Sequence, residues 1–315
     1  MSVLRQLLRA DTAGAPRGRR GLWTGKRLAQ IRDELGCLGL SVCANTVRGL
    51  LDRLGYALHA NRKSLSGKQS PDRDQQFHYL QGQQRRFTRQ GLPIVSVDSK
   101  KKELVGPFKN AGQVWSRQPT PVNDHDFRSQ AKGIALPRCL YDLQANRGSV
   151  VVGTSHDTPE FAVDALVQWW RTEGRRRYPK AQQVLVLADS GGSNSARCRL
   201  WKYALQERLV DPYGLTVTMC HYPPGASKWN PVEHRLLSEI SKHWAGQPLE
   251  DYPTILRLIG ETRIKTGLRV SCHLNPQYYP TGRKVSAQQM QELNLEKQQV
   301  LPDWNYTLSP RKKGN

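Results

Sequence analysis

The stretch QVLVLADSGGSN, residues 183–194, constrains the fold of this chain more than any other. Its four consecutive apolar residues, 184–187, are followed closely by Asp189 and then by a serine and two glycines. A short apolar run that ends in turn residues is typical of a strand buried on both faces, as in a sheet covered by helices. An acid at the carboxyl end of such a strand lies where open α/β sheets place their sites. A cap on the following helix is the alternative role for Asp189.

The charge balance indicates the kind of partner. Among 315 residues, 48 are Lys or Arg and 26 are Asp or Glu, so the formal net charge is +22. Such an excess favours a polyanionic partner, with nucleic acid as the first candidate and a membrane surface as its rival. No apolar run reaches the length of a membrane span, and the start of the chain has no signal-peptide pattern. We therefore expect a nucleic acid as the partner, and no membrane.

The cysteines indicate neither zinc nor disulfides. No C-x-x-C pair occurs, and no pair of histidines lies near a pair of cysteines at the spacing of a zinc finger. Without a secretion signal, scattered thiols are expected to be reduced, as in a cytosolic protein. The six positions are Cys37, Cys43, Cys139, Cys198, Cys220 and Cys272.

The first sixty residues predict a small helical region. Residues 1–22 are predicted to be a flexible basic lead-in, and residues 23–60 a helix-turn-helix region. Apolar residues recur at helical spacing in LAQIRDEL and VRGLLDRL, with the Gly-rich turn GCLGL between them. The second helix would present Asn45, Thr46 and Arg48 near its N-terminus, the part that usually enters the major groove. Many small helical pairs have this pattern without binding DNA, so a structural role is the alternative.

A second acid ends another predicted strand. A linker and a helix are predicted for residues 61–92, and the β-branched run in LPIVSVD then predicts a strand that ends at Asp98. A surface ion pair with the lysines that follow is the alternative for Asp98, but it fits poorly directly after a buried strand. The segments CLYDL and SVVVG then predict a hairpin. A helix follows it over residues 161–170.

A third acid lies in the segment HYPPGASKWNPVEHRL. Asn230 suits an N-cap, the proline after it suits the first helical turn, and Glu233 falls at the third helical position. A capping box formed by Asn230 and Glu233, which needs no chemistry, is the alternative role for Glu233.

The order of these elements is that of the ribonuclease H-like fold. It runs strand with Asp98, hairpin, helix, strand with Asp189, helix, strand, helix with Glu233. We expect an α/β fold with a mixed sheet flanked by helices over residues 93–250. A helical extension and tail, with a disordered basic tip, is expected over residues 251–315.

In that fold the two acid-bearing strands lie side by side, and the last helix brings the third acid over them. Three carboxylates packed together repel one another unless cations lie between them. Two Mg²⁺ ions about 3.5–4 Å apart meet this need, and they also activate a water or a 3′-hydroxyl at a phosphodiester. Mg²⁺ suits Asp and Glu because it is a hard ion that prefers oxygen.

The sequence resembles the DDE transposases of bacterial insertion sequences, of the ISAzo type, whose catalytic domain is similar to that of the mariner-like enzymes. The matching blocks are VSVDSKKKELVGPFKN, YDLQANRGSVVVGTSHDTPEFAV, LADSGGSNSARCRLWK, CHYPPGASKWNPVEHRL and DWNYTLSP. The resemblance implies that Asp98, Asp189 and Glu233 are the catalytic, metal-binding acids. It also implies cleavage at the ends of an element and joining of the 3′-hydroxyl to target DNA.

Further expectations follow from the same resemblance. Mg²⁺ is the implied cofactor, with Mn²⁺ as a substitute. The implied partner is double-stranded DNA, bound by a homo-oligomer in the bacterial cytoplasm at the nucleoid. Family members usually carry an additional N-terminal helical region, so a shortened copy is expected, and Cys43 stands where the family tends to place a capping serine. The expected phosphate contacts are Lys100, Arg175, Arg176, Arg177, Lys228 and Arg235.

Two other functions stay open at this point. One is a truncated, non-catalytic DNA-binding protein that represses its element through residues 23–55. The other is a ribonuclease H-like nuclease that acts on branched DNA. Cleavage that depends on Mg²⁺ separates the first from a transposase, and substrate preference separates the second.

Overall fold

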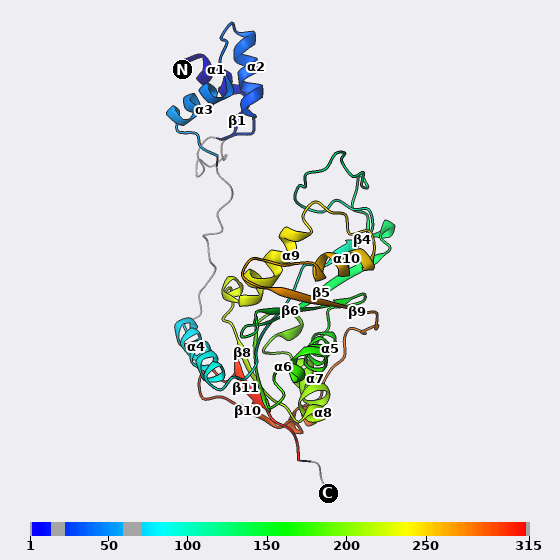
Figure 1. Cartoon of the computed structure of the whole chain (residues 1–315). Coiled ribbons are helices and arrows are strands. Elements are labelled where there is room, and N and C mark those ends of the chain that lie inside the picture. The colour runs from blue at the N-terminus through cyan, green and yellow to red at the C-terminus, as the bar shows by residue number, and fades with distance from the viewer. Residues whose placement is uncertain (1, 14–22, 59–70, 313–315) are drawn as a thin grey trace. The chain divides into compact units, whose positions relative to one another are not determined.

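The computed structural model describes residues 2–13, 23–58 and 71–312 (Figure 1). The pattern of contacts divides the chain into two compact units, Met1–Leu65 and Ser66–Asn315.

The described residues of the N-terminal unit form three helices and a short pair of strands. The unit contains α1 (Ser2–Asp11), α2 (Leu28–Cys37) and α3 (Ala44–Arg53), and the short strands β1 (Thr12–Ala13) and β2 (Trp23–Thr24) pair antiparallel. The helices α2 and α3 are the two that the apolar spacing predicts. Their common core consists of Leu4, Leu8, Ile31, Leu35 and Val47, all of which are buried.

The flexible lead-in predicted for residues 1–22 is wrong for α1. Leu4 and Leu8 lie four residues apart on one face of this helix, and both are buried against α2 and α3. Burial of this stripe stabilises a helix of ten residues, a length that is marginal in isolation. Residues 14–22 of the predicted lead-in lie outside the described residues.

The C-terminal unit is built on a mixed sheet of nine strands. Across the sheet the order is β10-β11-β8-β7-β3-β5-β6-β9, with β4 paired to β5. β3 is parallel to β7 and antiparallel to β5, β7 is parallel to β8, and β5 is antiparallel to β6. The central order β6-β5-β3-β7-β8 confirms the ribonuclease H-like arrangement. The bounds are β3 (Ile94–Ser99), β4 (Glu103–Val105), β5 (Gly133–Asp142), β6 (Arg147–Gly153), β7 (Gln183–Ala188), β8 (Thr216–His221), β9 (Arg269–Asn275), β10 (Leu295–Lys297) and β11 (Asn305–Leu308).

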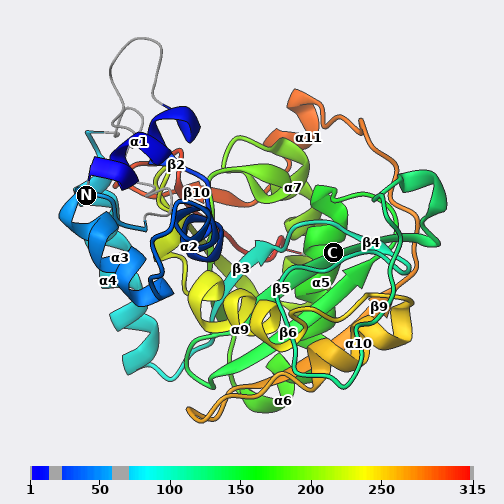
Figure 2. The ribbon, with the colours of Figure 1, turned by 90° about the horizontal axis from the view of Figure 1, so that it is seen from above.

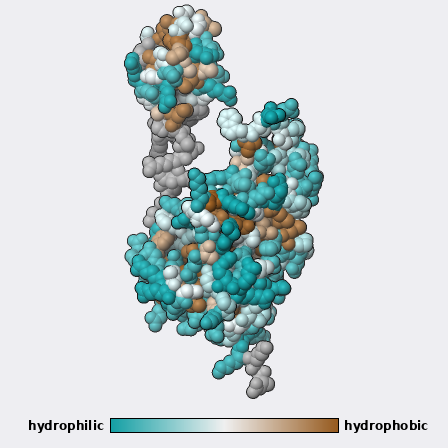
Figure 3. All heavy atoms as spheres, viewed as in Figure 1, coloured by the Kyte–Doolittle hydropathy of each residue, from teal (hydrophilic) through white to brown (hydrophobic). Residues whose placement is uncertain are grey.

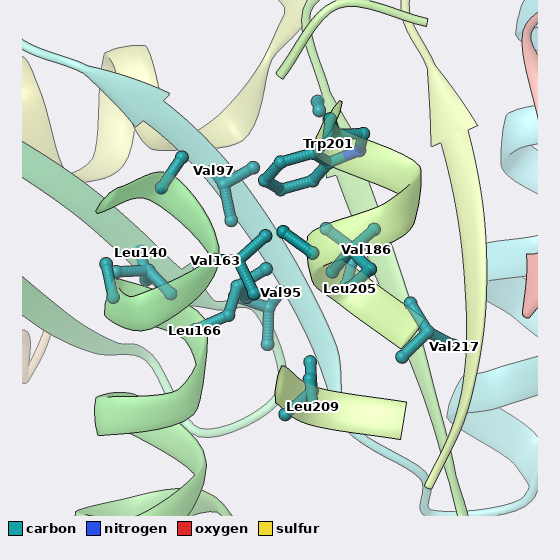
Figure 4. Close-up of a cluster of buried hydrophobic side chains, with 14 of the residues drawn as sticks. Val95, Val97, Leu140, Val163, Leu166, Val186, Trp201, Leu205, Leu209 and Val217 are labelled. Atoms are coloured by element: carbon teal, nitrogen blue, oxygen red, sulfur yellow. The ribbon is translucent and has the colours of Figure 1, made fainter. Parts of the chain in front are cut away.

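Helices cover both faces of this sheet. α5 and α7 pack on one face, where Val95, Val97 and Val186 join the largest core cluster (Figure 4). α4 packs against Ile94 on the other face, and α9 and α10 lie over β5 and β6 on that face (Figure 1). The bounds are α4 (Arg73–Arg89), α5 (Pro159–Trp169), α6 (Arg175–Arg177), α7 (Arg199–Leu205), α8 (Asp211–Tyr213), α9 (Ser238–His243), α10 (Tyr252–Gly260) and α11 (Ala287–Gln291).

Within the described part of the chain, three stretches of helix contain a wider, π-helical turn. These turns are Trp170–Gly174 between α5 and α6, Gln206–Val210 between α7 and α8, and Glu233–Leu237 before α9. Such turns are often found at functional sites. The third begins at Glu233, the acid that the sequence places on this helix.

The helical extension predicted for residues 251–315 is only partly correct. α10 and α11 are helices, but β9, β10 and β11 are strands that join both edges of the sheet. β9 pairs with β6, more than a hundred residues earlier, so local sequence gives no sign of this pairing. The predicted disorder of the tip is also wrong for Arg311, which forms ion pairs with Asp211 and Glu207 at 2.6 Å each. Residues 313–315 lie outside the described residues.

Candidate active site

Two acids leave the sheet side by side. In the parallel pair of β3 and β7, Val97 lies opposite Ala188, so Asp98 and Asp189 are the next residues beyond this pair. Side chains alternate between the faces of a strand. Asp98 therefore shares a face with Ile94, and Asp189 shares it with Leu187, on the side that packs against α4.

The chain after β8 brings the third acid to the same face. A 3₁₀ turn at Ser227–Trp229 leads into the helix, and the Glu233 backbone N–H donates to the Asn230 carbonyl oxygen at 3.0 Å. Leu236 and Ile240 are both buried and hold this helix against the sheet. Figure 2 shows α9, the continuation of the helix, over β5 and β6. The close approach uses Gly148 on β6, because a Cβ there would lie 2.5 Å from Leu236 Cδ1.

The electrostatics show that the three carboxyl groups interact. Burial, and then the charge of Asp98, raise the pKa of Asp189 to about 6. Burial, the charge of Asp98 and a hydrogen bond to Asp98 raise the pKa of Glu233 to about 7. Burial also raises the pKa of Asp98. The site therefore resists carrying three negative charges at once, as carboxylates that share a site do.

The donor set fits a hard divalent cation. Three carboxyl groups converge, and carboxylate oxygens are the ligands that Mg²⁺ prefers. Over residues 2–13, 23–58 and 71–312, however, no three His, Cys, Asp or Glu side chains are arranged as the ligands of a metal ion. The acids are near enough to shift one another's pKa without being drawn into ligand geometry.

The alternative of a capping box formed by Asn230 and Glu233 does not hold, because the Asn230 side chain bonds to other partners. The Asn230 amide is fully buried, and it donates to Asp189 Oδ1 and to the Val97 carbonyl oxygen, both at 3.3 Å. Ser96 on β3 takes the capping role, since its Oγ accepts from the Val232 N–H at 3.1 Å. Ser96 Oγ also donates to Asn230 Oδ1. The hydroxyl of Ser96, a residue of β3, thus caps the start of the helix that carries Glu233.

The backbone of Asp189 is held by two further side chains that the sequence reading missed. His221 Nδ1 lies 3.0 Å from the Asp189 carbonyl oxygen, and Asn194 Nδ2 donates to the same oxygen at 3.3 Å. Burial lowers the pKa of His221 to about 4, so the ring is neutral and donates through Nδ1–H. Asn194 lies in the SGGSN turn, but nothing in the sequence pairs His221 with Asp189.

A buried arginine beside the acids was also missed. Arg138 on β5 is 1% exposed, and its Nη1 donates to Ser99 Oγ at 2.8 Å and to Ser193 Oγ at 3.2 Å. Those two hydroxyls donate in turn to the Asp157 carboxylate. The positive charge of Arg138 lowers the pKa values of Asp98 and Asp189, against the larger effect of burial. A charged residue between the apolar runs IALP and CLY was the available signal.

Two of the predicted phosphate contacts lie next to the acids. Lys228 and Arg235 are exposed and flank Glu233 in the chain. The Lys228 ammonium lies 4.1 Å from the centroid of the Trp229 ring, which holds it over an exposed aromatic surface. Lys100 is less available, because it lies 4.7 Å from the centroid of the Trp244 ring and 3.4 Å from Glu103.

The arginine cluster is not brought to the acids. Arg177 forms ion pairs with Asp142 at 3.4 Å and with Glu173 at 3.2 Å. Asp142 lies at the far end of β5, opposite Val95, whereas Asp98 lies opposite Cys139. Arg175 and Arg176 are exposed and lie beside Arg177 in α6. The cluster therefore lies toward the opposite end of these strands from Asp98.

In the N-terminal unit, the predicted DNA-reading residues are exposed. Asn45, Thr46 and Arg48 lie in the first turns of α3, while Val47 between them is buried. The side chain of Cys43, at the N-cap, makes no capping hydrogen bond to the backbone of the helix. Its Sγ lies 3.2 Å from Thr46 Oγ1 instead.

Solved structures of Mos1 transposase are similar to this chain at low identity. They include the mariner Mos1 paired-end complex with Mg (TM-score 0.45) and that with left transposon end (TM-score 0.43), each 16% identical over 82% of this chain and 69% of that one. The paired-end complex with Mn gives a TM-score of 0.44 at 16% identity, over 82% of this chain and 70% of that one.

No curated protein matches the sequence. The family described as the Rhodopirellula transposase DDE domain matches residues 3–310, which is nearly the whole chain. The chain therefore belongs to this family of DDE transposases.

Proposed function

We propose that this protein is a DNA transposase that cuts phosphodiester bonds at the ends of an insertion sequence and joins the freed 3′-hydroxyl to target DNA. The observation that carries the proposal is the convergence of Asp98, Asp189 and Glu233, where burial and then the charge of Asp98 raise the pKa values of Asp189 and Glu233. Three such acids in a DDE transposase family fit a polynucleotidyl transferase or endonuclease that depends on metal ions.

In this proposal Asp98, Asp189 and Glu233 hold two Mg²⁺ ions, and Mn²⁺ substitutes for them. Bound divalent ions supply an activated water or 3′-hydroxyl and stabilise the leaving oxygen. The protein's own part is to fix the acids. The pairing of β3 with β7 positions Asp98 and Asp189, and the packing of Leu236 and Ile240 positions Glu233.

The basic residues near this site would contact DNA phosphates. Lys228 and Arg235 are exposed beside Glu233, and Lys100 follows β3. Arg175, Arg176 and Arg177 would contact DNA farther from the site of cleavage. Because each phosphate contact releases counterions, binding weakens as salt rises, with a slope that reports the number of contacts.

The N-terminal unit would bind the element's ends as a helix-turn-helix region over residues 23–60. α3 would enter the major groove with Asn45, Thr46 and Arg48 toward the bases. We further propose that residues 61–92 connect this region to a catalytic domain starting at residue 93. That domain includes the strands of residues 251–315, because β9, β10 and β11 belong to its sheet.

Family membership supports a proposal for the assembly and its location. We propose that a homo-oligomer acts on double-stranded DNA, with both element ends bound, at the nucleoid in the bacterial cytoplasm. Among the described helices, none combines the length and the apolar character needed to cross a bilayer.

The test is nicking of supercoiled plasmid with Mg²⁺ or Mn²⁺, by this chain and by its Asp189→Asn variant. Nicking that requires the metal and is lost in the variant supports the proposal. DNA binding without nicking by either protein would favour the non-catalytic, repressor-like reading. A strong preference for branched DNA over linear ends would favour a nuclease.

A further inference from the structure

The buried amide of Asn230 is the only side chain among the described residues with a hydrogen bond to the carboxylate of Asp189. We propose that Asn230 is a positioning residue, which fixes the Asp189 carboxylate relative to the helix of Glu233 so that both acids can bind the same divalent cations. This inference rests on the proposed function, and it assigns to Asn230 a role distinct from that of a cation ligand.

The partners of Asn230 fix the orientation of its amide. Ser96 Oγ accepts the Val232 N–H, so the hydroxyl proton of Ser96 is free to be donated to Asn230 Oδ1. The Val97 carbonyl and the Asp189 carboxylate can only accept, and they receive the two Nδ2 protons. All hydrogen-bonding groups of the Asn230 side chain therefore have a partner, and each bond has a defined direction.

This chain of hydrogen bonds joins the three elements that carry the acids. Ser96 lies on β3, two residues before Asp98. Asn230 contacts Asp189 after β7 through its side chain, and its backbone oxygen accepts the Glu233 N–H. One residue thus touches the strand of the first acid, the carboxylate of the second and the backbone of the third.

The position is suited to a neutral donor. Ser96 and Asn230 both have 0% exposure, so solvent does not compete for their hydrogen bonds in this structure. An amide donates to Asp189 without adding charge, whereas an aspartate in its place would put a fourth carboxylate beside three that already repel one another. Within the described residues no side chain donates to Asp189 Oδ2, so this oxygen is left for a cation.

Removing a residue that orients a metal ligand typically lowers metal affinity or activity about 10–100-fold. We therefore expect Asn230→Asp to weaken Mn²⁺ binding about 10–100-fold. Ser96→Ala leaves the Asn230 amide in place but removes the donor that orients it. We therefore expect Ser96→Ala to weaken Mn²⁺ binding less than Asn230→Asp does. It serves as a second variant if Asn230→Asp folds poorly.

Asn305→Asp provides the matched control. Asn305 is also an asparagine with 0% exposure, and its amide donates to Gln76 Oε1 and to the Val300 carbonyl oxygen rather than to an acid. The substitution should lower the unfolding temperature as Asn230→Asp does. If burial of a charge were the whole effect, both variants would change metal binding alike.

The experiment is calorimetric titration of the full chain with Mn²⁺, together with thermal unfolding of each metal-free variant. The proposal predicts weaker Mn²⁺ binding for Asn230→Asp and Ser96→Ala, and wild-type binding for Asn305→Asp at a comparable loss of stability. Wild-type Mn²⁺ affinity in Asn230→Asp and Ser96→Ala, with binding lost in Asp189→Asn, would overturn the role of Asn230 alone. Wild-type affinity in Asp189→Asn would overturn the proposed function, and this inference with it.

Discussion

The site has a half built by strands and a half built by a helix. Asp98 and Asp189 follow directly from paired backbone, since Val97 and Ala188 lie opposite each other in a parallel ladder. Glu233 has no such ladder, because it lies in a π-helical turn on a segment that follows a loop. Its place depends on side chains, namely the Ser96–Asn230 pair and the packing of Leu236.

This difference separates two ways of placing a charged group. A strand pair fixes the backbone of both acids through regular hydrogen bonds, so that a slip by one residue would move every side chain to the other face. A helix that rests on a sheet can shift by small amounts whenever its contacts change. We therefore expect the helix-borne half of the site to be the half that mutations and metal ions move.

Replacing an acid should give the largest effect, and it should do so in both halves. We expect Asp98→Asn and Glu233→Gln each to lower plasmid cleavage by more than the ~100-fold upper end for residues that only support a ligand. Cleavage rates with Mg²⁺, measured beside DNA binding, check this. Glu239→Gln is the control on the same helix, since Glu239 pairs with Lys242 instead. Substantial cleavage by Glu233→Gln would show that Glu233 and its helix are not part of the active site.

Moving the helix without touching an acid should sharpen the comparison. A Cβ at Gly148 would lie 2.5 Å from Leu236 Cδ1, so Gly148→Ala should press the helix away from β6. Overpacking of this kind costs about 1–3 kcal/mol of unfolding free energy. We expect lower cleavage together with this loss, measured by denaturant unfolding and by nicking.

Gly191→Ala is the matched control beside the strand-borne half. Its backbone φ is −112°, which other residues adopt, and a Cβ there would meet nothing within 4 Å. Near-normal stability and cleavage are expected. An equal loss in Gly191→Ala and Gly148→Ala would contradict the idea that the helix is the sensitive half.

The pH dependence of stability should report the repulsion between the halves. The pKa values of Asp189 and Glu233 are raised in the folded protein to about 6 and about 7, so the folded state binds more protons than the unfolded state. This stabilisation is fully present below the pKa values of the unfolded chain and is lost as pH rises through 6 to 7. Metal-free protein should therefore unfold at lower temperature at pH 8 than at pH 5, as far as these groups are concerned.

Mg²⁺ should reverse that loss. The ion binds the ionised carboxylates and offsets their repulsion, so the rise in unfolding temperature on adding Mg²⁺ should be larger at pH 8 than at pH 5. The Asp189→Asn variant should respond to both pH and Mg²⁺ less than the parent. An Mg²⁺ effect that is independent of pH, or unchanged in the variant, would argue against binding between these acids.

The smallest effect is expected from a substitution in the N-terminal unit, which carries none of the three acids. Cys43 occupies the N-cap of α3 without capping its backbone through the side chain. Cys43→Ser should stabilise α3, and good N-caps typically contribute ~1 kcal/mol. Thermal unfolding of the chain and its affinity for DNA would measure this change. No gain would mean that the thiol's contact with Thr46 already serves the helix as well.

The sequence alone was sufficient to predict the strand-borne half of the site. Short apolar runs ending in Asp98 and Asp189 predict both strands and the positions of both acids, because a buried strand and its end are local features. The helix-borne half was predicted less well. Asn230 and Glu233 resemble a capping box, and only the tertiary structure shows Asn230 turned toward Asp189 with Ser96 in its place as the cap.

The remaining misses have one physical cause. β9 lies at one edge of the sheet beside β6, and β11 pairs with β8 toward the other, so their strand character depends on partners far away in the chain. Arg138 and His221 act likewise through contacts across strands, with Ser99 and Asp189. α1 is stabilised by burial of Leu4 and Leu8 against helices that follow it.

The most direct test of the account is the location of Mn²⁺ in crystals of the protein, found from its anomalous scattering. The account predicts anomalous peaks in contact with the carboxylates of Asp98, Asp189 and Glu233, with Asn230 still bonded to Asp189. Peaks that contact Asp98 and Asp189 while Glu233 stays away would restrict the site to its strand-borne half. Ordered Mn²⁺ elsewhere, with none between these three acids, would contradict the account.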